Sequence, residues 1–224
     1  MILTFMVNDS SDYIIPVDRY TVGKAAITIA NAFSGDPGIP YALPDPAKQA
    51  NLHHIIAYNL KLDLMNGGRI YAVSPECEGV ACWHTPDVTS SWLNKLRAGY
   101  LRLPFYGGLH YMRYAHQEDC FYARLKSKHA PERCVYLALL GVDPEHQGKG
   151  HGGKLIRHML QFADSQSLPC YLETQNMKNV NMYSSFGFKL KESTCFPPGT
   201  ECEAHIMIRD AVYKKPFYTF SGVS

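Results

Sequence analysis

The residues with the clearest potential for chemistry form a glycine-dense turn between a strand pattern and a helix pattern. The apolar run 135–142 stops at Pro144, and a glycine-rich segment then leads into a helical pattern. Glycines lack the Cβ atoms that keep ligands away from the backbone, and the N–H groups at a helix start carry partial positive charge. The turn at 147–153 therefore predicts a binding site for a phosphate or pyrophosphate group.

Three glycines of this turn also fit a dinucleotide-binding pattern. Gly148, Gly150 and Gly153 have the G-x-G-x-x-G spacing, and Glu173 ends the next strand, where a ribose-binding acid is expected. A dinucleotide fold needs further strand–helix–strand units, whereas the chain after Phe188 shows only strand and turn patterns. A P-loop fits less well, because Gly150 stands where Ser or Thr would hold magnesium. Dinucleotide binding is the less favoured alternative.

A second motif downstream gives the turn a more specific interpretation. The segment Val142-x-Pro144-x-x-Gln147-Gly148-Lys149-Gly150-x-Gly152 resembles the acyl-coenzyme A signature of the GNAT superfamily of N-acetyltransferases. Segment 176–188, with Tyr183 and a Gly187-Phe188 ending, looks like the second signature of that family. The run 136–142 is most similar to the puromycin acetyltransferase-like branch. The detailed similarity covers residues 134–209.

The resemblance implies a coenzyme A site. In the family, the strand before the turn splays from its neighbour, and the pantetheine arm enters the gap. Backbone groups of Leu140 and Val142 would bind this arm, the segment from Gln147 to Gly152 would cradle the pyrophosphate, and Asn176 would hydrogen-bond the pantetheine or its surroundings. The implied cofactor-binding residues are Leu140, Gly141, Val142, Gln147, Gly148, Lys149, Gly150, His151, Gly152, Asn176 and Asn179.

Acetyl transfer to an amine needs a base and an acid. An amine with a pKa of about 10.4 is almost fully protonated at neutral pH, so a base must take its proton, and Glu173 is the candidate. Tyr183 matches the family's tyrosine acid and would protonate the leaving thiolate. Its phenol, at a pKa of about 10, lies close to a thiol at about 8.5. The alternative role of Glu173 is a structural carboxylate, and that of Tyr183 is a buried core tyrosine.

The composition restricts the partners. A net charge of +2, with no basic block longer than Lys214-Lys215, predicts no nucleic-acid binding. No run reaches the ~18 apolar residues of a membrane span, and the N-terminus lacks a secretion signal, which favours the cytoplasm. Seven cysteines without tight zinc spacing predict reduced thiols and no metal site. Five scattered histidines are interpreted as structural or exposed: His53, His54, His84, His110 and His116.

The elements that must position these residues follow from apolar periodicity. The pattern predicts helices at 22–33 and 48–64 around a proline-rich connector at 40–46, and hairpin strands at 68–73 and 79–84. It then predicts a strand at 134–142, a helix at 150–164 and a strand at 170–174, followed by a helix at 179–185 and strands at 188–193 and 203–209. This order predicts an α/β (α+β) fold with a mixed, mainly antiparallel sheet flanked by helices.

The segment 85–131 is the least regular part of this pattern. It is rich in aromatic residues and fits two short helical stretches, at 92–100 and at 111–125 beyond Gly107 and Gly108. Aromatic side chains at helical spacing favour a core role, and a wall of the substrate pocket is the second alternative.

Together these features predict a single N-acetyltransferase domain over 1–224. It has an aromatic-rich insertion at about 85–131 and a C-terminal extension at about 211–224, which covers either the sheet or a partner subunit in a homodimer. The expected reaction moves an acetyl group from acetyl-CoA to the primary amine of a small molecule. A catalytically silent acyl-CoA-binding or regulatory protein is the alternative. No motif identifies the acceptor.

Overall fold

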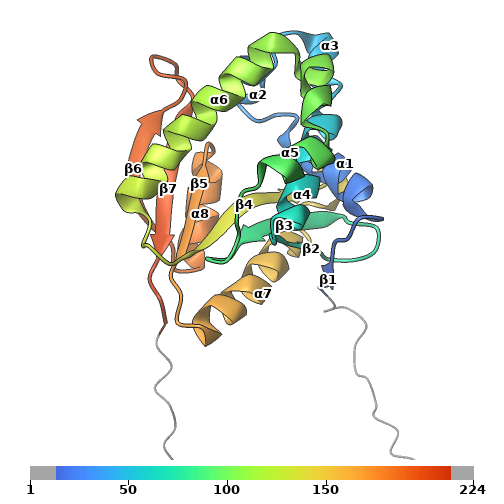
Figure 1. Ribbon diagram of the computed structural model, residues 1–224. Coiled ribbons are helices and arrows are strands. Elements are labelled where there is room, and N and C mark those ends of the chain that lie inside the picture. Colours follow the sequence, from blue (N-terminus) through green and yellow to red (C-terminus); the bar gives the residue numbers. More distant parts are fainter. Residues whose placement is uncertain (1–13, 213–224) are drawn as a thin grey trace, which may run out of the picture.

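Residues 14–212, the part of the chain that the computed structural model describes, form a seven-stranded sheet with helices on both faces (Figure 1). The strands are β1 Ile15–Pro16, β2 Arg69–Ala72, β3 Gly79–His84, β4 Val135–Val142, β5 Cys170–Thr174, β6 Lys189–Cys195 and β7 Glu203–Arg209. Their order is β1-β2-β3-β4-β5-β7-β6, and within these residues β4 and β5 form the one parallel pair. The predicted mixed, mainly antiparallel sheet is confirmed.

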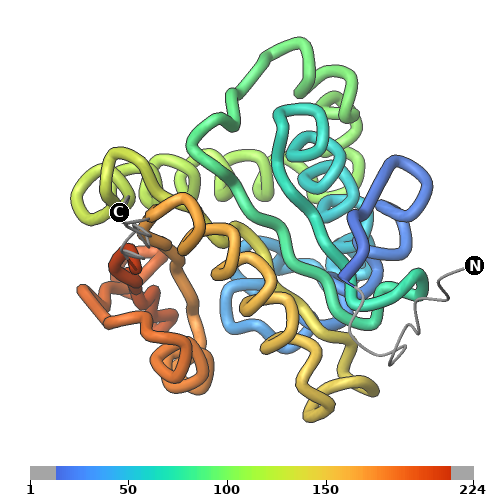
Figure 2. Tube along the Cα trace, turned by 90° about the horizontal axis from the view of Figure 1, so that it is seen from below, coloured from blue at the N-terminus to red at the C-terminus, as the bar shows by residue number. Residues whose placement is uncertain are grey.

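Helix α7, His151–Ser165, connects the two parallel strands and covers one face of the sheet. Its apolar residues recur at helical spacing, and the buried ones are Leu155, Ile156, Met159, Leu160 and Ala163. Figure 2, seen from below, has α7 on the near side of the strands. The helix is also tied to β7, because Asp164 forms a two-pronged ion pair with Arg209 at 2.6 and 3.0 Å. The predicted helix at 150–164 is confirmed to within one residue.

Helices α1, Val22–Phe33, and α4, Leu52–Met65, cover the opposite face. Side chains alternate along β3, so that Val80 and Cys82 pack with α1 and α4, while Ala81 and Trp83 pack with α7. Gly141 of β4 lets α1 approach closely. A Cβ added there would lie 2.9 Å from Cδ1 of Ile29.

The helix predicted over 48–64 is confirmed from Leu52 onward as α4, but its predicted start is wrong. Two helices occupy this region, α3 Pro46–Gln49 and α4, and a further short helix, α2 Ile39–Ala42, lies in the predicted proline-rich connector. Asp45 explains the start of α3, because its side chain accepts the Ala47 N–H at 2.9 Å and Pro46 takes the first helical position. These are helix-start signals that apolar periodicity does not register.

The two helical stretches predicted within 85–131 are present, and the second is longer than expected. This segment forms α5 Trp92–Ala98, a 3₁₀ turn at Tyr100–Arg102 and the 27-residue helix α6 Leu103–His129. Gly108 adopts the non-helical angles φ 76° and ψ 178°, so α6 consists of two helical stretches joined at a kink, at the glycine pair where the sequence predicted a break. In Figure 1, α6 crosses above the sheet. Its last residues, Lys128 and His129, both hydrogen-bond Glu192 of β6.

The remaining elements agree closely with expectation. Strands β5 and β7 have the predicted bounds, and α8, Met177–Ser185, begins two residues before its predicted start. Apart from Ala211 and Val212, the predicted C-terminal extension lies outside the described residues. In the described part of the chain, no helix has the length and apolar character needed to cross a bilayer.

Candidate active site

Strands β4 and β5 separate toward their carboxyl ends. They pair at Val135–Cys170, Tyr136–Tyr171 and Leu137–Leu172, and beyond this point β4 continues to Val142 without β5 pairing. The backbone groups of this part of β4 on its β5 side are therefore available to an extended ligand. The expected splayed strand pair is present.

The glycine turn lies directly after the splayed part of β4. Gly148 and Gly150 have φ of 77° and 81°, a conformation that a side chain would strain. The first backbone bond of α7 joins the Lys154 N–H to the Gly150 carbonyl at 3.0 Å. The N–H groups at 151–153 therefore precede the helical ladder and have no acceptor within it. They form a cradle for an anion.

Side chains at the start of the turn hold it against the sheet. The Gln147 amide donates to the Val142 carbonyl at 3.2 Å. Asp143 accepts the Glu145 N–H at 3.1 Å and the Asn31 amide of α1 at 3.0 Å. A Cβ added at Gly152 would lie 3.7 Å from Cγ2 of Val142, so the helix start and the end of β4 are in contact. The turn is thus a fixed structure.

The two predicted asparagines lie at the start of α8, but they do different things. Asn176 is the N-cap residue of α8, and its side chain accepts the Lys178 N–H at 2.9 Å. Asn179 donates to Oγ1 of Thr174 at 3.3 Å and lines a cavity. Lys149 is exposed, whereas Nδ1 of His151 is buried and has no hydrogen-bond partner among residues 14–212. The side chain of Asn176 therefore caps α8, whereas the side chain of Asn179 can meet a ligand in the cavity.

A cavity of about 510 Å³ begins at the splayed strands and extends under α6. Leu140, Glu173 and Tyr183 all line it. Tyr183 is 5% exposed, and within residues 14–212 its hydroxyl makes no hydrogen bond. Burial raises the pKa of this phenol, so it stays protonated at neutral pH. A proton donor and a carboxylate therefore share one enclosed space beside the strand gap.

Glu173 is half-buried in this cavity. Burial raises the pKa of its carboxyl group, and the neighbouring phenols of Tyr171 and Tyr136 oppose that rise. A carboxylate whose pKa is moved toward neutrality accepts a proton more readily than an ordinary one.

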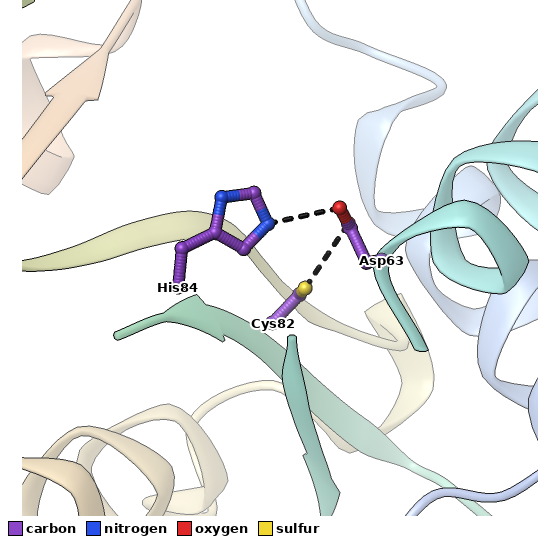
Figure 3. A group of neighbouring side chains, drawn as sticks. All are labelled: Asp63, Cys82 and His84. Carbon is purple, nitrogen blue, oxygen red and sulfur yellow. Dashed lines mark hydrogen bonds and ion pairs between the residues drawn. The ribbon is translucent and has the colours of Figure 1, made fainter. Parts of the chain in front are cut away.

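Asp63, Cys82 and His84 form a group on the cavity side of β3 that the sequence interpretation missed (Figure 3). Nε2 of His84 lies 2.9 Å from Oδ1 of Asp63, and the Cys82 thiol donates to Oδ2 of Asp63 at 3.2 Å. Cys82 and His84 are two residues apart on one strand face, which was the available signal. Asp63 comes from α4, and only the fold brings it to them.

The ligand atoms of these three residues lie within 4.8 Å of one another, close enough to hold one metal ion. A metal would need the thiolate of Cys82. Burial, together with the charge of Asp63, raises the pKa of this thiol well above its usual value, and the thiol hydrogen bonds to Asp63. The group is therefore best described as a hydrogen-bonded network beside the cavity.

Comparisons with known proteins agree with this geometry. Residues 97–188 match the model of the acetyltransferase (GNAT) family, a span that includes β4, the glycine turn, α7, β5 and α8. This part of the chain is therefore similar to the GNAT superfamily of N-acetyltransferases. An uncharacterised N-acetyltransferase of Schizosaccharomyces pombe is 27% identical over 178 residues, which cover 76% of this chain and 71% of that protein. The N-alpha-acetyltransferase RimI of Mycobacterium tuberculosis is 38% identical over 50 residues, 22% of this chain and 32% of that protein.

Solved structures show the GNAT fold. The crystal structure of a histone acetyltransferase HPA2 and related acetyltransferase from Corynebacterium glutamicum aligns with a TM-score of 0.64 and 21% identity, over 92% of this chain and 99% of that one. The fold class expected from the sequence is thereby confirmed. The finer similarity to the puromycin acetyltransferase-like branch stays a prediction.

Proposed function

We propose that this protein transfers an acetyl group from acetyl-CoA to the primary amine of a small molecule by direct attack on the thioester. The observation that carries this proposal is that the features a coenzyme A thioester needs lie next to one another. The anion cradle of the glycine turn adjoins the unpaired part of β4, and that strand opens into the cavity that holds Tyr183 and Glu173. Family similarity supports the choice of donor.

The cradle fits the pyrophosphate of coenzyme A. Positive φ at Gly148 and Gly150 turns the chain, and the N–H groups at 151–153 meet no acceptor in the helix. The pantetheine arm would lie along Leu140 and Val142, with Asn179 at the cavity end. Gly141 would contribute only its backbone groups. A glycine is needed at this position because α1 packs closely against it.

The protein supplies the proton transfers in this scheme. Glu173 takes a proton from the acceptor ammonium, directly or through water, and its raised pKa suits that exchange. The neutral amine then attacks the thioester carbonyl, the carbon–sulfur bond breaks, and Tyr183 gives its proton to the departing thiolate. The acylated nitrogen gives up its extra proton to the Tyr183 phenolate, directly or through water, which restores the acid.

The dinucleotide alternative loses its structural basis. In the described residues, β5 is followed by the antiparallel strands β7 and β6, with no second parallel crossover. A dinucleotide fold needs that second unit.

A panel of primary amines tests the proposal, with release of the coenzyme A thiol as the measurement. We expect acetyl-CoA-dependent thiol release that needs an added amine, and an acetylated product detectable by mass spectrometry. A silent acyl-CoA-binding protein would instead be stabilised by coenzyme A and would release no thiol with any amine. That result would contradict acetyl transfer but would still support a coenzyme A binding site.

A further inference from the structure

The part of the cavity farthest along α6 is acidic. The cavity is lined by five carboxyl groups, those of Asp36, Asp63, Glu118, Asp119 and Glu173. No Lys or Arg from residues 14–212 lines it. His84 already hydrogen-bonds Asp63, and Asp36 accepts the Gly38 N–H at 2.9 Å.

Glu118 lacks such compensation, whereas Asp119 is exposed and faces the positive charges of Lys95 and His116. Among the described residues, none donates a hydrogen bond to either carboxyl group. Burial, together with the charges of Asp119 and Asp36, raises the pKa of Glu118 to about 7. A carboxylate in this position is stabilised by a cation that replaces the lost water.

An independent observation at the same place points to a ligand. Tyr114 is 5% exposed and lines the cavity beside Glu118, yet its hydroxyl has no hydrogen-bond partner in the described structure. Buried hydroxyl groups without partners are rare, because the group loses its water and gains nothing. This hydroxyl can accept a hydrogen bond from an ammonium group in the cavity.

The aromatic walls suit a cation as well. Tyr111, Tyr114 and Tyr122, all from α6, line this region. Burial raises the pKa of each phenol, so the rings stay neutral. Neutral aromatic faces attract ammonium groups and also pack against the methylene chain between two amines.

We propose that the acceptor carries a second cationic group, bound by Glu118 and Asp119 beside Asp36 and the Tyr114 hydroxyl, while its other amine reaches Glu173. The substrate class is therefore a diamine or a longer polyamine. This inference rests on the proposed acetyl transfer. A monoamine would leave the Glu118 carboxylate without a cationic partner, and an acceptor with a carboxylate at this end would be repelled.

Three acceptors of equal chain length test the inference: 1,5-diaminopentane, pentylamine and 5-aminopentanoate. With saturating acetyl-CoA, kcat/KM for the diamine should exceed that for pentylamine by about tenfold or more, the lower limit expected for one charge-assisted hydrogen bond. The value for 5-aminopentanoate should be the lowest.

Variants identify the groups responsible. Glu118→Gln and Asp119→Asn keep size and remove charge, and each should lower the ratio of diamine to pentylamine kcat/KM toward one. Tyr114→Phe should lower the ratio by a smaller factor. Glu132→Gln removes one charge at an exposed position outside the cavity and should leave the ratio unchanged.

The outcomes separate this inference from the proposed function. Equal kcat/KM for diamine and monoamine, or a ratio insensitive to Glu118→Gln, would overturn the inference while acetyl transfer stands. If no amine is acetylated, acetyl transfer fails, and calorimetric titration of 1,5-diaminopentane into the coenzyme A-bound protein still tests the acidic site. Binding weakened by Glu118→Gln supports the site, and absence of binding overturns it.

Discussion

At the scale of single residues, the site depends on side chains that burial keeps in their neutral forms. Tyr183 is enclosed with its phenol protonated, and Glu118 sits among other acids. Desolvation destabilises a charged group more than a neutral one, so such residues change ionisation only when a reacting or charged ligand compensates.

Tyr183→Phe should reduce kcat by about 10² to 10⁴, the usual contribution of a positioned acid or base, because only the phenolic proton is lost. The affinity for coenzyme A should change little. Steady-state kinetics and calorimetric titration measure the two effects. The exposed residue Tyr20 supplies the control, because Tyr20→Phe also removes one hydroxyl. Unchanged kcat in Tyr183→Phe would eliminate the acid role.

Glu118 makes a separate prediction about stability and pH. Its pKa is about 7 in the folded protein and near 4.3 in an unfolded chain. A raised carboxyl pKa contributes stability below about pH 4.3, and this contribution is lost as the pH rises toward 7. The groups that face it are the carboxyls of Asp119 and Asp36, the phenols of Tyr111, Tyr114 and Tyr122, and the thiol of Cys202.

Glu118→Gln should therefore stabilise the protein relative to the native chain at pH 8 by about 1 to 3 kcal/mol, and have little effect at pH 4.5. The shift corresponds to 1.36 kcal/mol per pKa unit, reduced because water screens a half-buried group. Denaturant unfolding at the two pH values measures the difference, with Glu132→Gln as the control. A variant equally destabilised at both pH values would contradict it.

At the scale of elements, sequence patterns predicted the strands and the amphipathic helices well. Helix α7 has a continuous apolar face, and β5 and β7 have their expected bounds, because burial on one face imposes a regular period. The failure before α4 had a local cause. Pro46 was interpreted as part of a connector, whereas it begins α3. The break predicted at Gly107 and Gly108 corresponds to the kink in α6.

The glycine turn gives an element-scale prediction. Gly150 has φ 81° with open space around its missing Cβ, so Gly150→Ala adds only backbone strain, about 1 to 2 kcal/mol. Relief of that strain would redirect the N–H groups at 151–153, and coenzyme A should bind about tenfold more weakly or worse. Titration calorimetry measures this.

The matched control for this change is Gly23→Ala in α1. Gly23 also has open space, but it is helical and exposed, so alanine there should stabilise the protein by about 0.5 to 1 kcal/mol. Its affinity for coenzyme A should equal that of the native chain. Equal affinity in Gly150→Ala would show that the turn does not bind the pyrophosphate.

At the scale of the whole molecule, the cavity depends on contacts that no local pattern encodes. Tyr183 could be chosen because it lies within the second signature, and Glu173 because it lies near the end of the strand that follows the glycine turn and its helix. Glu118 lies in α6 and Asp36 follows α1, and they meet only because α6 crosses above the sheet (Figure 1). Their charges gave no periodic signal, so the acidic end of the cavity was not predictable.

Topology also decides which nucleotide should stabilise the whole protein. The described part of the chain has one parallel strand pair with an anion cradle beside it, which suits coenzyme A, and it lacks the second unit that a dinucleotide requires. Coenzyme A at about 100 times its Kd should stabilise the folded state by about 2.7 kcal/mol, which raises Tm by about 5 to 10 °C for a chain of this size. NAD at the same concentration should leave Tm unchanged, and Gly150→Ala should reduce the rise seen with coenzyme A. Both ligands carry a pyrophosphate, and they differ in the part of the molecule that would lie between the splayed strands and in the cavity. A larger rise in Tm with NAD than with coenzyme A would therefore contradict the assignment of the turn to coenzyme A.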